Sequence, residues 1–549
     1  MRKTGLRVLS AIAAVATLVG VVSGCGTAVQ NNSLSEQAKS ASTDVTSISL
    51  DGKNVQEGGT LTMGLSSDPD KLDPTLSSSL YSRYVFANSC EKLYDINAQG
   101  DTVPLLAASD PTISEDGKTY TFDVKQGVKF ADGTDFNAAA VVKTLERDLN
   151  LKGSARKSEL GPITDVKATG TYTVEIDLSS PYAPLTAALA DRAGMIMSPK
   201  ALDELGDNFA SAPVCVGAFK VVERVPSTSI TLEKDPNYYD AKNVHIDKIV
   251  YKIIKDAAIR AQNLKSGDVQ VADNLTPQDV ATLNEDPNIT MMSVSSLGFQ
   301  GLYVNVGNVN GVGQPVGDLN TDFAKQKVIR QAFDMSVDRD QLVQSVYGGL
   351  YEKACSFISD SSPFASETSR TCLPHDPAKA KQMLQDAGVS VPLTVKVQVS
   401  NTQSSLQMMQ ALQSQVKEGG FDLQIEPVEY TSLLENMNNG NYDDAAQMGW
   451  SGRIDPDGNS KALFTTGGSM NYDGYSNAKF DDLIKQASQV SDTAKRADLY
   501  GQAIDVMRDD MPYIFLYRQR YLTGVTHSVA GVDVYGDGVV RLTHAAFVQ

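Results

Sequence analysis

Two β-α-β units constrain the fold of this chain more than any other feature of its sequence. In the unit at 246–272, a dense apolar strand is followed by a helix and a second short strand. The unit at 393–428 repeats this order with longer elements. Strands that alternate with helices predict an α/β fold. Alternating segments such as 172–178, with no helix pattern beside them, indicate that the sheets are mixed.

Helix starts are marked by residues that cap free backbone N–H groups. Asn137 precedes an amphipathic segment that reaches Leu149, and Asp338 precedes another helix. Thr276 and Asp376 are each followed by proline, the order expected at a helix start. The later part of the chain is more helical, with two further helices expected between 477 and 510.

Length and charge limit the classes of protein that fit. A chain of 549 residues is long enough for roughly three to four domains. Its composition, 41% hydrophobic and 21% charged, is that of a globular protein. The formal net charge of −18 argues against nucleic acid or an anionic membrane as the main partner, since both select basic surfaces.

The N-terminus has the pattern of an export signal over residues 1–24. Cations at the start precede an uncharged apolar run, Val8–Val22, which at about 15 residues is short for a transmembrane helix. The run ends in Val-Ser-Gly-Cys, which resembles the bacterial lipobox and makes Cys25 the expected lipidation site. The polar stretch at 25–57 is then a flexible tether. The alternative is a plain secretory signal with an incidental cysteine.

Four cysteines remain after Cys25, and an even number in an exported chain favours disulfides over metal ligation. Four cysteines allow three pairings. Cys355 and Cys372 lie in one polar segment, which favours a local bridge and leaves Cys90 with Cys215. No CxxC is present and the four histidines are well separated, so we expect no metal site.

Sequence motifs of known catalytic chemistry are missing. The segment 449–452, Gly-Trp-Ser-Gly, is one residue short of a nucleophile elbow, and no HExxH, Walker loop or GxGxxG occurs. Asp455, Asp457 and Asn459 resemble the start of a calcium loop, but the required glycine and glutamate are absent. We therefore expect no catalytic residues and no cofactor. A secreted hydrolase stays as an alternative because carboxylates are abundant.

Several stretches together resemble the extracytoplasmic solute-binding proteins of ABC importers, family 5, which includes oligopeptide, dipeptide and nickel receptors. The best is DGKTYTFDVKQGVKFADGTDFNAAAVV at 116–142, which matches the family signature in order and spacing. Further matches, in chain order, are CEKLY at 90–94, VCVGAFKV at 214–221, LEKDPNYYD at 232–240, VIRQAFDMSVDRDQLV at 328–343 and GWSGRIDPDGN at 449–459.

This resemblance implies a type II periplasmic-binding-protein clamshell of two lobes and three domains, with mixed β-sheets and a ligand between the lobes. The expected boundaries are 58–89, 210–298 and 515–549 for a discontinuous domain I, 90–209 for domain II, and 299–514 for domain III, the second lobe. Peptides in this family lie extended and bind through backbone hydrogen bonds, which gives affinity with little side-chain selectivity.

The resemblance also implies a ligand site. In peptide receptors of this family an Asp that binds the ligand's α-amino group stands where this chain has Arg453. Either Asp455 takes over that role, or the ligand presents a carboxylate to Arg453, or Arg453 pairs with Asp455 or Asp457 and touches no ligand. The full set of expected ligand-binding residues is Tyr81, Tyr303, Asn305, Trp450, Ser451, Gly452, Arg453, Asp455 and Asn471.

The function expected from the sequence is a lipid-anchored receptor that delivers a solute, with a peptide as first choice, to an ABC transporter permease. It would be a monomer on the outer face of the bacterial cytoplasmic membrane and would touch the membrane only through its N-terminal lipid. The alternatives are a receptor for an opine, an oligosaccharide or a metal chelate, the secreted hydrolase, and a purely structural surface lipoprotein.

Overall fold

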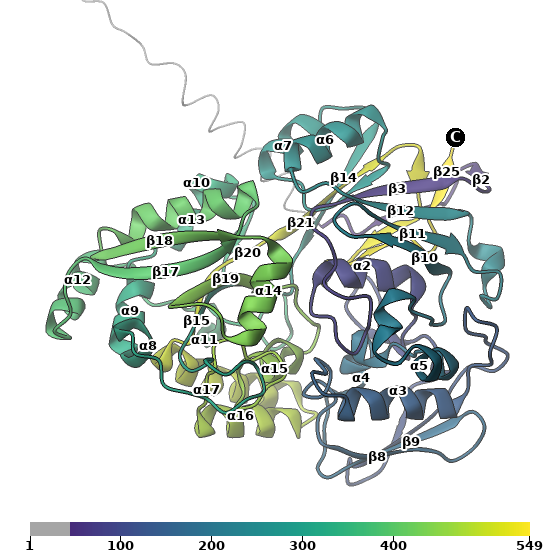
Figure 1. Ribbon diagram of the computed structural model, residues 1–549, viewed down its shortest axis with the longest axis horizontal. Coiled ribbons are helices and arrows are strands. Elements are labelled where there is room, and N and C mark those ends of the chain that lie inside the picture. The colour runs from purple at the N-terminus through teal and green to yellow at the C-terminus, as the bar shows by residue number, and fades with distance from the viewer. Residues whose placement is uncertain (1–43) are drawn as a thin grey trace, which may run out of the picture.

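The computed structural model describes residues 44–549 and shows two lobes side by side (Figure 1). The predicted export signal and the predicted lipidation site Cys25 lie outside the described residues. Each lobe contains one of the two β-α-β units that the sequence predicted. The units are β12 (Lys248–Ile253), α6 (Ala257–Ser266) and β13 (Val271–Ala272) in the first lobe, and β17 (Leu393–Ser400), α13 (Gln403–Val416) and β18 (Phe421–Val428) in the second.

A seven-stranded mixed sheet forms the centre of the first lobe, in the order β10-β11-β12-β3-β13-β21-β14. Strands β12 and β13 lie on either side of β3 (Thr60–Leu65) and run parallel to it. Helices α2 (Leu80–Ser89), α6 and α7 (Pro277–Leu283) connect or flank these strands. The other strands are β10 (Phe219–Val225), β11 (Ser229–Lys234), β14 (Ile289–Ser295) and β21 (Arg520–Thr526).

The first lobe also holds a smaller α/β layer, seen at the lower right of Figure 1. Its four-stranded sheet has the order β6-β7-β9-β8 and packs against α3 (Ala138–Asn150). The Asn137 side chain accepts from Ala140 N at 3.2 Å and so caps α3 as expected. The remaining elements are β4 (Tyr94–Ile96), β5 (Thr102–Pro104), β6 (Thr112–Ile113), β7 (Thr119–Asp123), β8 (Ile163–Ala168), β9 (Thr173–Leu178), α4 (Leu185–Ala188) and α5 (Pro199–Leu205).

The second lobe is built on a six-stranded sheet in the order β16-β20-β15-β19-β17-β18. Strands β17 and β18 are parallel, whereas β15 pairs antiparallel with both β19 and β20. The strands are β15 (Phe299–Val304), β16 (Glu352–Lys353), β19 (Ala445–Trp450) and β20 (Tyr513–Arg518). The helices are α8 (Asp322–Lys325), α9 (Lys327–Met335), α10 (Arg339–Tyr347), α11 (Glu367–Arg370), α12 (Pro377–Asp386), α14 (Tyr430–Asn439), α15 (Lys461–Phe464), α16 (Ala478–Ser488) and α17 (Thr493–Asp510).

The chain passes between the sheets of the two lobes at two adjacent places. It runs from β14 to β15 through residues 296–298, and from β20 to β21 through Gln519 alone. The two crossings are hydrogen-bonded, because Ser296 N donates to Gln519 O at 3.2 Å. Two short, paired segments are the arrangement that lets lobes rotate about a common axis.

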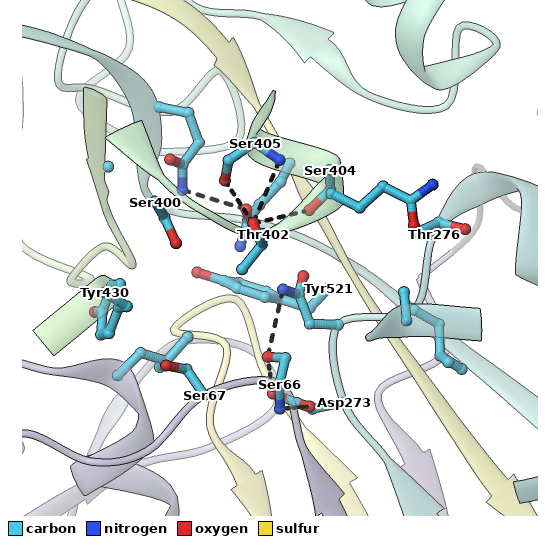
Figure 2. A pocket seen from close by; sticks show the side chains of 18 of the residues that line it. Ser66, Ser67, Asp273, Thr276, Ser400, Thr402, Ser404, Ser405, Tyr430 and Tyr521 are labelled. Atoms are coloured by element: carbon cyan, nitrogen blue, oxygen red, sulfur yellow. Dashed lines mark hydrogen bonds between the residues drawn. The ribbon is translucent and has the colours of Figure 1, made fainter. Parts of the chain in front are cut away.

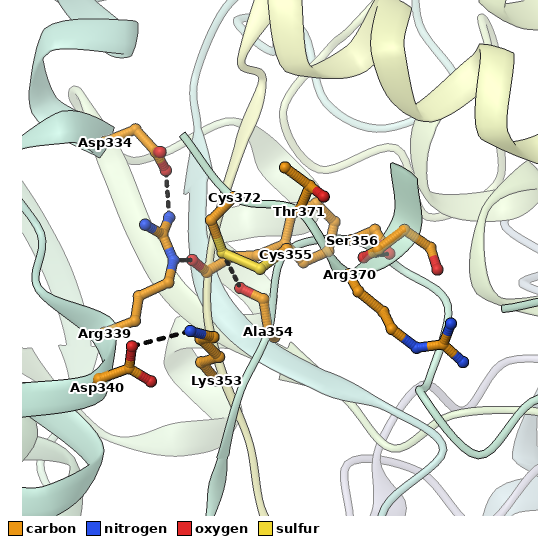
Figure 3. The surroundings of a disulfide bond; sticks show 12 residues. Asp334, Arg339, Asp340, Lys353, Ala354, Cys355, Ser356, Arg370, Thr371 and Cys372 are labelled. Atoms are coloured by element: carbon orange, nitrogen blue, oxygen red, sulfur yellow. Dashed lines mark hydrogen bonds and ion pairs between the residues drawn. A yellow bond between two sulfur atoms is a disulfide. The ribbon is translucent and has the colours of Figure 1, made fainter. Parts of the chain in front are cut away.

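Both predicted disulfides are present, which confirms the expected pairing of the four cysteines. Cys90 ends helix α2 and is bonded to Cys215, 125 residues away in sequence. Cys355 and Cys372 are 17 residues apart and close a loop in the second lobe. Figure 3 shows the ion pairs of Arg339 with Asp334 and of Lys353 with Asp340 beside this second bridge.

The segment 44–57 corrects the expectation of a tether that extends to residue 57. Residues Ser47–Ile48 (β1) pair with β23 (Val532–Val534), and Val55–Gln56 (β2) pair with β25 (Ala546–Val548). Asp44 forms an ion pair with Arg520. Although polar, this segment is held by backbone pairing with the C-terminal strands, which include β22 (Val529–Ala530) and β24 (Val540–Arg541). Within residues 44–549, no helix combines the length and the hydropathy that crossing a membrane requires.

Candidate functional site

A cavity with a volume of about 200 Å³ lies between the two lobes. That is room for on the order of ten water molecules. Its walls include the carboxyl ends of β3 and β13 in the first lobe and of β17 and β19 in the second. Figure 2 shows Ser400 and Thr402 on one side of it and Ser66 and Ser67 on the other. Ligands of open α/β sheets bind outside such strand ends.

Hydroxyl, carboxamide and aromatic groups make up most of the cavity wall. Tyr81 is in edge contact with Tyr430 of the other lobe, with ring centroids 5.4 Å apart. On another wall, Tyr347 and Tyr351 stack at 4.2 Å. Three of the carboxamides, Gln300, Gln447 and Gln519, lie near the crossings, and Gln300 Nε2 donates to Gln519 Oε1 at 3.2 Å. A wall of this kind offers hydrogen bonds and flat apolar surfaces in equal measure.

Ser400 carries a hydroxyl that the protein leaves without a partner. It lies at the end of β17 and is buried, and its Oγ has no hydrogen-bond partner. Figure 2 shows the Ser400 side chain directed toward the cavity. A buried hydroxyl without a partner is costly, so a ligand group that bonds to it gains that energy.

The charged residues on the cavity wall are already paired within the protein. Lys255 Nζ lies 2.8 Å from Glu429 Oε1 of the other lobe, and this pair is partly exposed. Asp273 Oδ1 and Oδ2 accept from Ser66 N at 2.8 Å and Ser66 Oγ at 3.0 Å, and Arg260 Nε is 3.6 Å from Asp273. Burial raises the pKa of Asp273 to about 6, although the charge of Arg260 opposes the shift.

The hydrogen bonds of Arg260 are likewise made within the protein. Its guanidinium donates to the backbone oxygens of Ile254 at 2.6 Å, Asp273 at 2.9 Å and Asn274 at 2.7 Å. These bonds fasten the start of α6 to the loop after β13, so the side chain acts as a structural cross-link.

Three of the expected ligand-binding residues line this cavity, namely Tyr81, Trp450 and Ser451. Trp450 is 6% exposed, and its Nε1 donates to Gly458 O at 3.1 Å and to Asn459 Oδ1 at 3.0 Å. Ser451 Oγ accepts from Arg83 Nη1 of the first lobe at 3.1 Å. These residues therefore lie where the lobes meet.

Gly452, Arg453 and Asp455 lie behind Trp450 and outside the main cavity. Gly452 has φ +89°, and a Cβ there would come within 2.3 Å of Gly298 N, so glycine is needed for the close approach of two chain segments. Arg453 and Asp455 line a separate cavity of about 20 Å³, which has room for about one water molecule.

Arg453 joins the two lobes. Its guanidinium forms an ion pair with Asp191 of the first lobe, donates to Gly452 O at 2.8 Å, and lies 4.3 Å from the centre of the Trp450 ring. Burial lowers the pKa of Arg453 to about 10, although Asp191 acts in the opposite direction. The carboxylate partner is thus neither Asp455 nor Asp457, the two partners that sequence proximity suggested.

Asp455 and Asp457 have other partners. Both oxygens of Asp455 bind Arg496, each at 2.7 Å, so the charge of this carboxylate is already neutralised within the protein. Asp457 Oδ2 accepts from Tyr182 OH of the first lobe at 2.5 Å. This is a further contact between the lobes, near Arg453.

A network of charges continues from Arg453 into the first lobe. Arg83 binds Asp191 Oδ1 through Nε at 3.1 Å and Asp537 Oδ2 through Nη2 at 3.1 Å. Burial alone would raise the pKa of Asp191, but Arg453 and Arg83 hold it well below its usual value. Burial also opposes ionisation of Asp537, yet Arg541 and Arg83 lower its pKa to about 2.

Tyr303, Asn305 and Asn471 lie in the interior of the second lobe and do not line the main cavity. The Tyr303 ring is fully buried among Tyr472, Tyr513 and Phe464. Asn305 Nδ2 donates to Tyr442 O at 3.0 Å, and Asn471 Nδ2 donates to Tyr475 O at 2.8 Å. Both amides stabilise turns of the backbone.

The sequence reasoning missed most residues of the cavity wall. The missed side chains belong to strand ends and helix starts, a position that a β-α-β pattern does indicate. Ser400 and Thr402 between β17 and α13 could have been found in this way. Other missed wall residues are Ser66, Ser67, Gln300, Gln447, Tyr430, Tyr517, Gln519 and Tyr521. Residues 44–549 contain no group of three or more side chains that could hold a metal ion.

A fold of two lobes with a cavity between them is the arrangement expected of a ligand receptor. The model of the bacterial extracellular solute-binding proteins, family 5 (middle part), matches residues 101–471, and the chain belongs to this family. Family membership confirms the predicted class, a solute-binding receptor and not an enzyme.

Curated relatives and solved structures agree with this assignment. The glutathione-binding protein GsiB of Escherichia coli K12 is 26% identical over 477 residues, covering 85% of this chain and 90% of that protein. DppA of Helicobacter pylori in complex with the peptide STSA has a TM-score of 0.82 at 23% identity, covering 90% of this chain and 99% of the other.

A further structure, AgaA from A. tumefaciens R10 in complex with agropinic acid, has a TM-score of 0.78 at 25% identity and covers 89% and 98% of the two chains. The predicted fold, a type II periplasmic-binding-protein clamshell, is confirmed by these structures.

Proposed function

We propose that this protein captures a peptide between its two lobes and delivers it to the permease of an ABC importer. The observation that carries the proposal is the cavity between the lobes, whose walls come from both. Relatives named for glutathione and for peptides support a peptide as ligand. Opines, oligosaccharides and metal chelates are the alternatives within the same class.

Closure would occur about the paired crossings at 296–298 and Gln519. The domains would then be those expected from the resemblance, with domains I and II moving together as one lobe and domain III as the other. A lipid on Cys25 would hold the receptor at the outer face of the membrane, as a monomer. Closure about a hinge gives the permease two distinguishable states of the receptor.

Trp450 provides the experiment because it is the only tryptophan of the chain and lines the cavity. Purified protein is unfolded and refolded to remove bound ligand, then titrated with mixtures of short peptides, with free and with blocked termini, while tryptophan emission is recorded. We expect a saturable change in emission without breakdown of the peptide. If calorimetry detects binding while the emission stays constant, the ligand site lies elsewhere; if no peptide binds, the peptide proposal fails.

A further inference from the structure

The chemistry of the cavity wall restricts the charge of the ligand. The charged wall residues, all within the described part, are Lys255, Arg260 and Asp273. Lys255 is paired with Glu429, and Asp273 is bound by Ser66 and lies beside Arg260. Every charged side chain of the wall therefore already has a partner of opposite charge within the protein.

Charged residues close to the cavity do not supply an unpaired charge for a ligand either. Glu429 binds Lys255 and also accepts from Thr431 N at 2.7 Å as the cap of α14. Arg453 lies behind the Trp450 ring, bound to Asp191, and Asp455 is bound by Arg496. A charged ligand terminus that is buried when the lobes close would thus lose hydration without gaining an unpaired partner charge, which is unfavourable.

The same wall is rich in uncharged hydrogen-bonding groups. Ser400 Oγ is buried and has no partner in the protein. Gln447 is buried on the wall, and Ser67 lines the cavity from the other lobe. With aromatic rings between them, such groups bind amides and hydroxyls by direct hydrogen bonds and stacking.

We infer that the cavity selects ligands that present no formal charge to it: peptides with blocked or cyclised termini, or neutral polyhydroxylated solutes. The shared chemistry is a set of uncharged donors and acceptors that match the Ser, Gln and Tyr groups of the wall. This inference rests on the proposed receptor function, and it narrows the ligand class.

The test compares three probes on the wild-type protein by calorimetry and by Trp450 emission. The probes are trialanine with free termini, N-acetyl-trialanine amide, and the neutral trisaccharide maltotriose. We expect at least one uncharged probe to bind at least ten-fold more tightly than free trialanine. Comparison of the two uncharged probes shows whether the preferred ligand is a peptide or a sugar. Equal or tighter binding of free trialanine would overturn the inference while leaving the peptide receptor intact.

Variants of the wall give an independent check. Ser400→Ala should weaken the better uncharged probe about two- to ten-fold, since one hydrogen bond is lost, whereas Ser266→Ala on the exposed end of α6 should change nothing. Gln447→Glu places a free carboxylate in the cavity and should shift the preference toward free trialanine by ten-fold or more. An unchanged preference in Gln447→Glu, with the fold intact by circular dichroism, would also overturn the inference. If sugar alone binds, the peptide proposal fails and the inference stands.

Discussion

Replacing Arg453 with alanine should favour separation of the lobes. The Arg453 side chain is 10% exposed and its partner Asp191, on the opposite lobe, is 8% exposed. Because the ion pair spans the interface, it exists only while the lobes are in contact. Arg453→Ala therefore removes a contact of the closed form and leaves the open form unchanged.

The free-energy cost expected for Arg453→Ala depends on the ion pair that Asp191 retains after the substitution. Removal of one partner of a buried ion pair costs about 3–5 kcal/mol when the other charge is left unpaired. Here Asp191 still binds Arg83, whose Nη2 is 3.0 Å from Asp191 Oδ2, so we expect a smaller cost of about 2–3 kcal/mol. That corresponds to a shift of roughly 30- to 150-fold in the ratio of closed to open molecules.

Small-angle X-ray scattering of the unliganded protein measures this shift as an increase in the radius of gyration. Asp191→Asn and the double variant complete a cycle, and a coupling of about 1–3 kcal/mol between the two sites is expected. Lys255→Met is the matched control, since the Lys255–Glu429 pair also joins the lobes but is 39% and 32% exposed. An exposed pair contributes at most about 1 kcal/mol.

Two results would refute the reasoning. One is a radius of gyration for Arg453→Ala that equals that of the wild type; the other is an equal effect of Lys255→Met. The alternative role, binding of a ligand carboxylate by Arg453, is tested with one ligand and its amide. If Arg453→Ala weakens both forms equally, Arg453 acts on closure alone; if only the acid is weakened, Arg453 contacts the ligand.

Three further predictions concern stability and location. Asp537 has a lowered pKa of about 2, so its ionised form stabilises the fold above about pH 4, and this contribution is lost as the pH falls toward 2. Asp537→Asn should cost about 2 kcal/mol at pH 7, measured by urea unfolding, and the difference from wild type should vanish near pH 2. Loop length predicts that loss of the Cys90–Cys215 disulfide lowers the free energy of unfolding by about 5 kcal/mol, and loss of Cys355–Cys372 by about 3 kcal/mol. Urea unfolding of the two double-serine variants measures both values, and the reverse order would contradict the prediction. Cys25→Ser should release the protein into the medium with its unfolding curve unchanged, and a variant that stays with the membrane would contradict the lipobox.

The fold could be predicted from the sequence because its signals are local. Asn137, Thr276, Asp338 and Asp376 each cap the helix that the pattern placed after them. Strand alternation located the sheets in the same way. The segment at 44–57 was misjudged because its composition is polar, while its strands are held by backbone hydrogen bonds to the far end of the chain, which composition does not record.

The site was harder to predict because position along a strand decides which residues reach the cavity. In β15, Tyr303 pairs with Ala446 and Gln300 pairs with Gly449 of β19. The cavity lies at the Gln300 end, so Gln300 and Gly449 line it while Tyr303 is buried among aromatic rings. Both faces of β15 are covered, and hydrophobic alternation therefore gives no sign of which end is open.

The location of two interlobe contacts, Arg453–Asp191 and Tyr182–Asp457, separates affinity from selectivity. Arg453–Asp191 and Tyr182–Asp457 lie outside the main cavity, and Lys255–Glu429 involves one wall residue that is already neutralised. Contacts that set the closed fraction without touching a ligand multiply every dissociation constant by the same factor. Arg453→Ala should hence lower the affinity for all ligands of the closed form by the same factor. Ser400→Ala should instead change the ranking of the ligands by affinity. In this receptor, the buried ion pair would set how tightly any solute is held, and the uncharged wall would decide which solute it is.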